Sequence, residues 1–326
     1  MISRRALLAV LIAGGQALAV GVCDAQAQGY PTKPIRLVVA NPPGGLTDTV
    51  SRMLSARLQE AFGQPVLVDN KPGANGSVAA STLLASPADG YTFLVADGSL
   101  VSVNPLTTKK LAYDPVKDFV AVALVARAPL FLAVSPALNV GTLEQLVAVA
   151  KASPGKLTYG SSGIGSTHHL TMEALKAALG LDIVHVPYKG SSASVPALVG
   201  QQVDMVFSAY PSIAGFVKSG QVRLVAVNSA QRSPLAPEVP TVAETIKGFD
   251  YAPIVILLAL HGTPPEAIKR MSDEVAKIAK HPDAVELMRP VGVDLVGGSA
   301  AQLARALDEE RARMAKTGRL ANLQPE

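Results

Sequence analysis

Short aliphatic segments alternate with helix-like segments along this chain, and this order constrains its fold more than any other feature. Residues 35–40 form an aliphatic run that ends at a Pro-Pro-Gly-Gly loop, after which apolar side chains recur at helical spacing as far as Ala61. Strand, loop and helix follow one another again over residues 65–85 and 157–179. Such alternation is typical of parallel strands with flanking helices, so the sequence predicts an α/β fold.

The length of 326 residues exceeds that of one average domain, so two lobes are expected. An aliphatic strand near residues 252–260 returns the chain to its first half. The first lobe is therefore predicted to combine residues 28–126 with 252–326, including two terminal helices that pack back on it. The second lobe is predicted to comprise residues 127–251. Ligands bind in open α/β sheets at the carboxyl ends of the strands, so the cleft between the lobes is the expected site.

The first 27 residues have the features of a secretory signal peptide. Two arginines precede an apolar run over residues 6–22, and an Ala-Gln-Ala sequence offers cleavage after Ala27. We therefore expect a periplasmic protein whose mature chain begins at Gln28, with the Sec and twin-arginine routes both open. A permanent membrane anchor is disfavoured because the run is short for a bilayer span. Lipidation of Cys23 is disfavoured because a valine precedes it.

Cysteine usage and charge exclude several classes of protein. Cys23 is the only cysteine and would leave with the signal peptide, which excludes disulfides, thiolate catalysis and Cys-ligated metals. The net charge of +4 comes from scattered Lys and Arg, without the basic stripe of a nucleic-acid-binding protein. Neither G-x-x-x-x-G-K-[ST] nor G-x-G-x-x-G occurs, and the histidines at 185, 261 and 281 lack metal-ligand spacing. No metal, cofactor or nucleic-acid partner is expected.

The first candidate binding loop joins the first strand to the first helix. Gly44 and Gly45 allow the backbone to approach a ligand closely, and Thr47 or Asp48 can cap the helix. Unpaired N–H groups at a helix start attract an anion such as a carboxylate. These four residues and Pro42 are candidate binding residues, and a plain turn before a capped helix is the alternative.

A second glycine-rich loop leads from a strand into the helix predicted over residues 167–179. One such loop is a weak signal, but two loops in separate α/β units can face each other across a cleft and hold a carboxylate without Arg or Lys. The candidate residues here are Ser161, Gly163, Gly165, Ser166, Thr167 and His169.

His169 leaves an enzymatic interpretation open. A secreted ester hydrolase could use His169 with Ser162 or Ser166, although no G-x-S-x-G elbow accompanies them. A structural or ligand-orienting role for His169 is favoured over that of a catalytic base. The segment over residues 185–190 is interpreted as a turn within the lobe.

Many ordered stretches resemble the Bug family, the periplasmic solute receptors of tripartite tricarboxylate transporters. They cover nearly all of the mature chain and include YPTKPIR at 30–36, PPGG followed by Thr47-Asp48, GQP at 63–65, NKPGA at 70–74, DGYT at 89–92, YDP at 113–115, DF at 118–119, PGKL at 154–157, HVPYKG at 185–190 and VPTVAE at 239–244. The resemblance implies a type II periplasmic-binding-protein fold with two α/β lobes. It also implies that backbone amides, hydroxyls and water hold one ligand carboxylate between the two glycine-rich loops, with Ser99 near the cleft.

Two departures from the family pattern bear on the ligand. The family often has an acidic residue after the position of Phe207, where this chain has Ser208 and Ala209. Many relatives carry Trp-Tyr-Gly where this chain has Ile-Val-Ile at residues 254–256. Both changes make the cleft less charged and more aliphatic. We therefore expect an aromatic or apolar carboxylate slightly ahead of a citrate-like one, and both ahead of an amino acid.

The expected protein is thus a monomeric receptor, not an enzyme, that delivers a small organic carboxylate to the membrane permease of the transporter. A ligand-loaded sensor that contacts a signalling protein is the remaining alternative, because transport and sensing use the same closed cleft.

Overall fold

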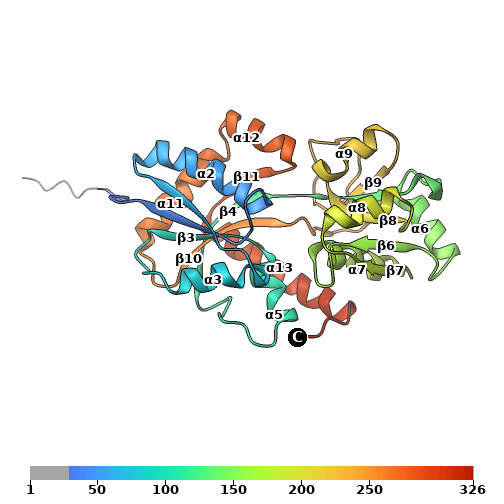
Figure 1. The fold of residues 1–326 in the computed structure, drawn as a ribbon, viewed down its shortest axis with the longest axis horizontal. Coiled ribbons are helices and arrows are strands. Elements are labelled where there is room, and N and C mark those ends of the chain that lie inside the picture. The colour runs from blue at the N-terminus through green and yellow to red at the C-terminus, as the bar shows by residue number, and fades with distance from the viewer. Residues whose placement is uncertain (1–28, 326) are drawn as a thin grey trace, which may run out of the picture.

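The computed structural model describes residues 29–325, and the predicted signal peptide lies outside them. Two sheets lie side by side along the long axis of the molecule, each with its own helices (Figure 1). We propose that these two units are the two lobes expected from the sequence: the first sheet draws its strands from residues 35–127 and 254–298, and the second from residues 130–227.

The first sheet has six strands in the order β11-β4-β10-β3-β1-β2. β1 pairs in parallel with β2 and β3, whereas β10 runs antiparallel to β3 and β4, and β11 runs antiparallel to β4. The sheet is therefore mixed, because β10 returns from the second lobe in the opposite direction. Every residue of β10 is buried, as its unbroken aliphatic sequence requires. The strands are β1 Ile35–Val39, β2 Val66–Asn70, β3 Thr92–Asp97, β4 Phe119–Arg127, β10 Ile254–Leu260 and β11 Asp294–Gly298.

The helical segments around this sheet begin mainly at the ends of its strands. They are α2 Leu46–Phe62, η1 Ala74–Gly76, α3 Ser77–Leu84, α4 Ser99–Ser102, α5 Asn104–Thr107, α11 Pro265–Ile278, α12 Pro282–Met288, η3 Arg289–Val291 and α13 Ala300–Leu320.

The second sheet has five strands in the order β7-β6-β8-β5-β9. β6 pairs in parallel with β7 and β8, and β5 runs antiparallel to β8 and β9. The strands are β5 Leu130–Val134, β6 Thr158–Ser161, β7 Val184–Pro187, β8 Met205–Ala209 and β9 Arg223–Val227. The helical segments are η2 Pro136–Leu138, α6 Leu143–Ala152, α7 Thr167–Leu179, α8 Ser191–Val199, α9 Tyr210–Lys218 and α10 Val242–Thr245.

Two segments cross between the lobes and are fastened together by one buried side chain. Asn228 accepts a hydrogen bond from the Leu130 amide at 2.8 Å through Oδ1 and donates to the Tyr251 carbonyl at 2.8 Å through Nδ2. The Ala128 amide donates to the Pro253 carbonyl at 2.9 Å beside them. The path between the lobes is therefore fixed by paired backbone groups rather than by a loose linker.

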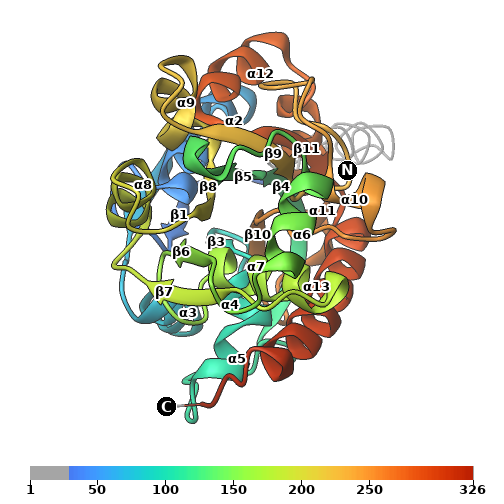
Figure 2. The same ribbon diagram turned by 90° about the vertical axis from the view of Figure 1, so that its right-hand side faces the viewer.

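The last helix, α13, serves both lobes. Leu303 and Leu307 pack into the core of the first lobe, whereas Met314 packs into the core of the second. Figure 2 shows α13 running beside α7, and Thr317 lies 2.8 Å from the Tyr251 hydroxyl. The first part of this helix packs on the first lobe, and its end reaches the second because 21 residues span about 30 Å.

Candidate functional site

A cavity of about 950 Å³ lies between the lobes. Its walls include residues that follow the carboxyl ends of β1, β3, β6 and β8, which is where ligands bind in α/β sheets. Residues of both glycine-rich loops line it, Gly44 from the first lobe and Gly165 from the second. The expectation that these loops face one cleft therefore agrees with the geometry.

The first loop is held by Asp48. Gly44, at φ +82°, donates its N–H to Asp48 Oδ2 at 2.8 Å, and the same carboxylate accepts from Arg52 at 2.9 Å and Asn70 at 2.8 Å. Burial alone would raise the pKa of Asp48, but these hydrogen bonds outweigh it and hold the pKa below its usual value. Asp48 is thus an ionised anchor of the loop; it is 1% exposed and does not line the cavity.

The start of α2 keeps unpaired donors. Gly45 precedes it without a side-chain cap, and its own N–H donates to the Pro42 carbonyl at 3.1 Å. Among the described residues, no hydrogen-bond acceptor meets the N–H groups of Leu46 and Thr47, and Leu46 lines the cavity. These amides, together with the dipole of a 17-residue helix, favour an anion.

The second loop has the same construction. The Gly165 N–H donates to His169 Nδ1 at 3.1 Å, the Gly163 N–H donates to Ser161 Oγ at 3.1 Å, and Ser166 Oγ caps α7 by accepting from the His169 amide. The N–H groups of the first two residues of α7, Thr167 and His168, meet no acceptor in the described part of the chain, and both residues line the cavity. The glycines therefore shape the loops, and the helix residues after them supply the free amides.

Three rings support the second loop from behind. His169 is buried and stacks on His185 with ring centroids 4.1 Å apart, and His185 stacks on Tyr159 at 4.7 Å. Burial lowers the pKa of His169 and lowers that of His185 to about 4. His185 Nε2 lies 2.7 Å from Ser161 Oγ, whereas the His169 ring bonds to a backbone amide and to no serine.

His168, not His169, is the histidine on the cavity wall. Its Nε2 lies 3.3 Å from Ser191 Oγ, which lies 3.1 Å from Ser162 Oγ. Burial lowers the pKa of His168 to about 4, so the ring is neutral at pH 7. This chain of hydroxyls and a neutral imidazole offers hydrogen bonds without a charge.

The residues singled out in the sequence fall into two groups, and their binding roles stay predictions. On the walls of the cleft lie Pro42, Gly44, Ser99, Gly165, Ser166, Thr167 and Ala209. The other predicted residues do not line the cleft: Thr47, Asp48, Ser161, His169 and Ser208 are buried, and Gly45 and Gly163 are half-buried.

Several wall residues were missed from the sequence. Asn41 follows β1 and Asp97 ends β3, so their positions at the carboxyl ends of buried strands could have identified them from the sequence. Nothing in the sequence around Asn75, Ser191 and Ser212 marked them as wall residues. Of the residues between 29 and 325 that line the cavity, Asp97 is the only one with a carboxyl group, and none is Lys or Arg. The rest of the wall is largely apolar, with Leu46, Val103, Leu130, Ile164, Pro211, Pro253, Val291 and Val293.

The lobes touch at two places beside the cavity. A Cβ at Gly165 would lie 3.1 Å from Thr107 Cγ2 of the first lobe, and a Cβ at Gly292 would lie 2.8 Å from Pro211 Cδ of the second lobe. Glycine at both positions, each with a positive φ, lets the lobes approach this closely. The two lobes are therefore in close contact beside the cavity.

Residues 50–322 match the family described as "Tripartite tricarboxylate transporter family receptor". The chain belongs to this family. Protein BugT of Bordetella pertussis is 34% identical over 265 residues, 81% of either chain. The identification from the sequence is thereby confirmed.

Solved structures of receptors in this family share the fold. "R. palustris Rpa4515 with adipate" has a TM-score of 0.77 at 34% identity and covers 91% of this chain and 100% of its own. "Periplasmic binding protein BugD" has a TM-score of 0.71 at 27% identity, covering 91% and 100%. "MatC (Rpa3494) from Rhodopseudomonas palustris with bound malate" has a TM-score of 0.70 at 27% identity, covering 89% and 100%. The predicted periplasmic-binding-protein fold is confirmed.

The family consists of periplasmic substrate-binding receptors, not enzymes, and the hydrolase interpretation of His169 is set aside. None of the helices between residues 29 and 325 is both long and apolar enough to cross a bilayer.

Proposed function

We propose that the protein captures a small organic carboxylate in this cleft and delivers it to the membrane permease of a tripartite tricarboxylate-type transporter. The observation that carries the proposal is the position of two helix starts. α2 from the first lobe and α7 from the second begin at the same cavity, and their first N–H groups have no acceptor in the described chain. One carboxylate placed between them would receive donors from both lobes and would favour the closed form.

The chemistry of the wall supports an aromatic or apolar acid over a citrate-like one. Citrate would bring three negative charges into the cavity. The described residues that line the cavity include no Lys or Arg, and they already include the carboxyl of Asp97. An uncompensated buried charge is costly, whereas the apolar residues of the wall favour an apolar body. Adipate, found in a solved relative, combines carboxylates with such an aliphatic body.

Calorimetric titration with benzoate, hexanoate, adipate and citrate tests the ligand class. We expect saturable binding of the first three and the weakest binding by citrate, with a rise in melting temperature for each bound acid. Tighter binding of citrate, aspartate or glutamate than of any apolar acid would refute the preference. Chemical turnover of a bound ester would refute the receptor function itself.

The permease partnership and the export are tested separately. Ligand-loaded protein should co-purify with the permease subunits from detergent-solubilised membranes of its own cell, and recovery of a signalling protein instead would favour the sensor. Intact mass of the periplasmic protein should correspond to a chain beginning at Gln28. Light scattering should give the mass of a monomer.

A further inference from the structure

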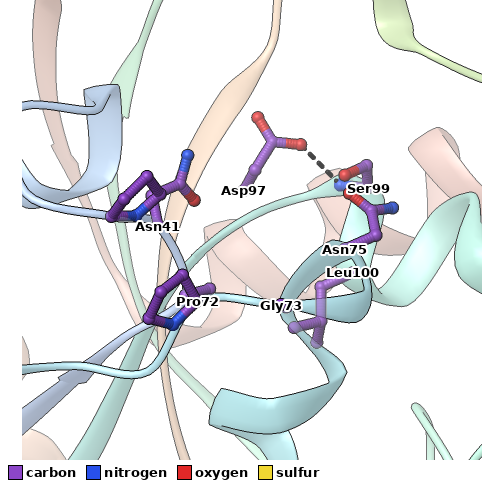
Figure 3. A pocket seen from close by; sticks show the side chains of 10 residues that line it. Asn41, Pro72, Gly73, Asn75, Asp97, Ser99 and Leu100 are labelled. Carbon is purple, nitrogen blue, oxygen red and sulfur yellow. Dashed lines mark hydrogen bonds between the residues drawn. The ribbon is translucent and has the colours of Figure 1, made fainter. Parts of the chain in front are cut away.

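A recess of about 220 Å³ extends the cleft into the first lobe at the carboxyl ends of β1, β2 and β3. It shares Asn41, Asn75, Asp97 and Ser99 with the large cavity, so the two spaces adjoin each other. Figure 3 shows these side chains from three separate loops around one space, with Pro72 and Gly73 on its other side.

Asp97 is the acidic side chain of this recess, and burial raises the pKa of its carboxyl above the ordinary value. Its Oδ1 accepts the Ser99 N–H at 2.8 Å, and no Lys or Arg in the described residues lies within salt-bridge distance of the carboxyl. In Figure 3 the carboxyl stands over the recess between Asn41 and Ser99. A carboxyl without a cationic partner at a ligand cavity leaves an acceptor for a group that enters from the cleft.

Asn75 adds a second acceptor. The side-chain nitrogen Nδ2 of Asn75 donates to Asn104 Oδ1, and the main-chain carbonyl oxygen of Asn75 accepts from Asn104 Nδ2 at 3.0 Å. Asn104 takes one hydrogen of the Asn75 amide nitrogen, and no hydrogen bond occupies the side-chain oxygen Oδ1 in the described residues, so Oδ1 is an acceptor that Asn75 offers at the recess. Asp97 and Asn75 therefore both offer acceptors at the recess, and none of the described residues that line it is Lys or Arg.

We propose that this recess recognises a hydrogen-bond donor, a hydroxyl or a protonated amine, that the ligand carries away from its carboxylate. The inference rests on the proposed function, in which the carboxylate occupies the helix starts of α2 and α7. It narrows the ligand to ω-hydroxy or ω-amino acids, aliphatic or aromatic, with an apolar body between the two ends. A second carboxylate is disfavoured because it would meet Asp97.

Two matched series of acids test the inference by calorimetric titration. The aliphatic series is hexanoate, 6-hydroxyhexanoate, 6-aminohexanoate and adipate; the aromatic series is benzoate, 4-hydroxybenzoate, 4-aminomethylbenzoate and terephthalate. In the series whose unsubstituted acid binds, we expect the hydroxyl-bearing or amine-bearing acid to bind at least tenfold more tightly than the unsubstituted acid. The dicarboxylate of that series should show no such gain. The order of the hydroxyl and amine acids distinguishes the two kinds of donor.

Asp97→Asn keeps the size of the side chain and an acceptor for the Ser99 amide but replaces the carboxyl with an amide. It should abolish most of the tenfold gain that the donor-bearing acids have over the unsubstituted acid. Asp283→Asn, which removes an exposed carboxylate on the same lobe, is the matched control and should leave this gain unchanged. The ranking on the unmodified protein decides the question even if Asp97→Asn fails to fold.

The outcomes separate the two proposals. If no acid of either series binds, the proposed function fails and the inference fails with it. If unsubstituted acids or dicarboxylates bind as tightly as the donor-bearing acids, or if Asp97→Asn weakens every acid alike, the recess is not a donor site and the receptor function stands.

Discussion

Ser102 Oγ donates a 3.0 Å hydrogen bond to Glu310 Oε1, which joins α4 at the cleft to the helix that spans both lobes. Glu310 is 7% exposed, and its Oε2 has no hydrogen-bond partner among residues 29–325. Gly98 leaves room for this carboxyl, because a Cβ there would lie 2.6 Å from Oε2. Burial, with Asp97 nearby, raises the pKa of Glu310 to about 7, whereas Ser102, Arg313 and Arg127 lower it.

This raised pKa predicts a loss of stability as the pH rises. The folded protein holds a proton on Glu310 that the unfolded chain releases near its ordinary pKa of about 4.5, so the stabilisation is complete below about pH 4.5 and lost towards pH 7. At about 1.4 kcal/mol per pKa unit, the effect is on the order of 3 kcal/mol. We expect Glu310→Gln to remove this part of the pH dependence in urea unfolding from pH 4.5 to pH 8.

Glu309→Gln is the control for this experiment, because Glu309 is the exposed neighbour on the same helix. Its unfolding free energy should follow the unmodified protein at every pH. If the free energy of unfolding of Glu310→Gln changes with pH in parallel with that of the unmodified protein, the Glu310 carboxyl is ionised in the folded state.

Because the lobes are in contact at Gly292, we expect a larger side chain at this position to open the cleft. Gly292→Ala places a methyl group 2.8 Å from Pro211 Cδ at a φ of +75°, whereas Gly220→Ala has nearly the same φ, +71°, and nothing within 4 Å. Both substitutions cost about 1–2 kcal/mol of backbone strain, but only the first pushes the lobes apart. We expect Gly292→Ala to weaken carboxylate binding about tenfold and to enlarge the radius of gyration in X-ray scattering. Equal affinities of the two variants would contradict the contact.

Support of the second loop by His169 predicts weaker binding in acid. His169 Nδ1 accepts the Gly165 N–H only when the ring is neutral, and burial lowers its pKa below the ordinary 6.5. The folded state thus binds fewer protons than the unfolded chain, so this stability is present above pH 6.5 and is lost as the pH falls through the lowered pKa. We expect constant affinity between pH 8 and pH 6.5 and a decline at lower pH, measured by titration calorimetry.

His169→Ala should weaken binding at pH 7 about tenfold, because it leaves the Gly165 amide without its acceptor. His281→Ala, at a half-exposed ring outside the cleft, should not. Unchanged affinity of His169→Ala would show that the loop keeps its shape without the ring.

Local sequence predicts the order of elements well, and tertiary contacts decide the rest. The strand over residues 35–39 and the helix after Gly45 follow from aliphatic runs and helical spacing. Spacing could not reveal that the Gly44 and Gly165 amides bond within their own loops, because their acceptors, Asp48 and His169, depend on the folded loop geometry. The place of Asp97 in the cleft likewise depends on how the first lobe assembles.

The segments that cross between the lobes are joined by the buried side-chain amide of Asn228, so we expect its removal to lower the free energy of unfolding strongly. Asn228→Ala leaves the Leu130 N–H and the Tyr251 carbonyl without partners inside the protein, and each such loss costs about 1–3 kcal/mol. We expect the free energy of unfolding in urea to fall by roughly 2–5 kcal/mol, whereas Gln231→Ala, at an exposed amide, should change it by less than about 0.5 kcal/mol. Because the side chain fastens both crossing segments, hydrogen exchange at residue 130 should also quicken in Asn228→Ala. A loss below about 1 kcal/mol would mean that water replaces the side chain and that the crossing is less tightly closed than these hydrogen bonds require.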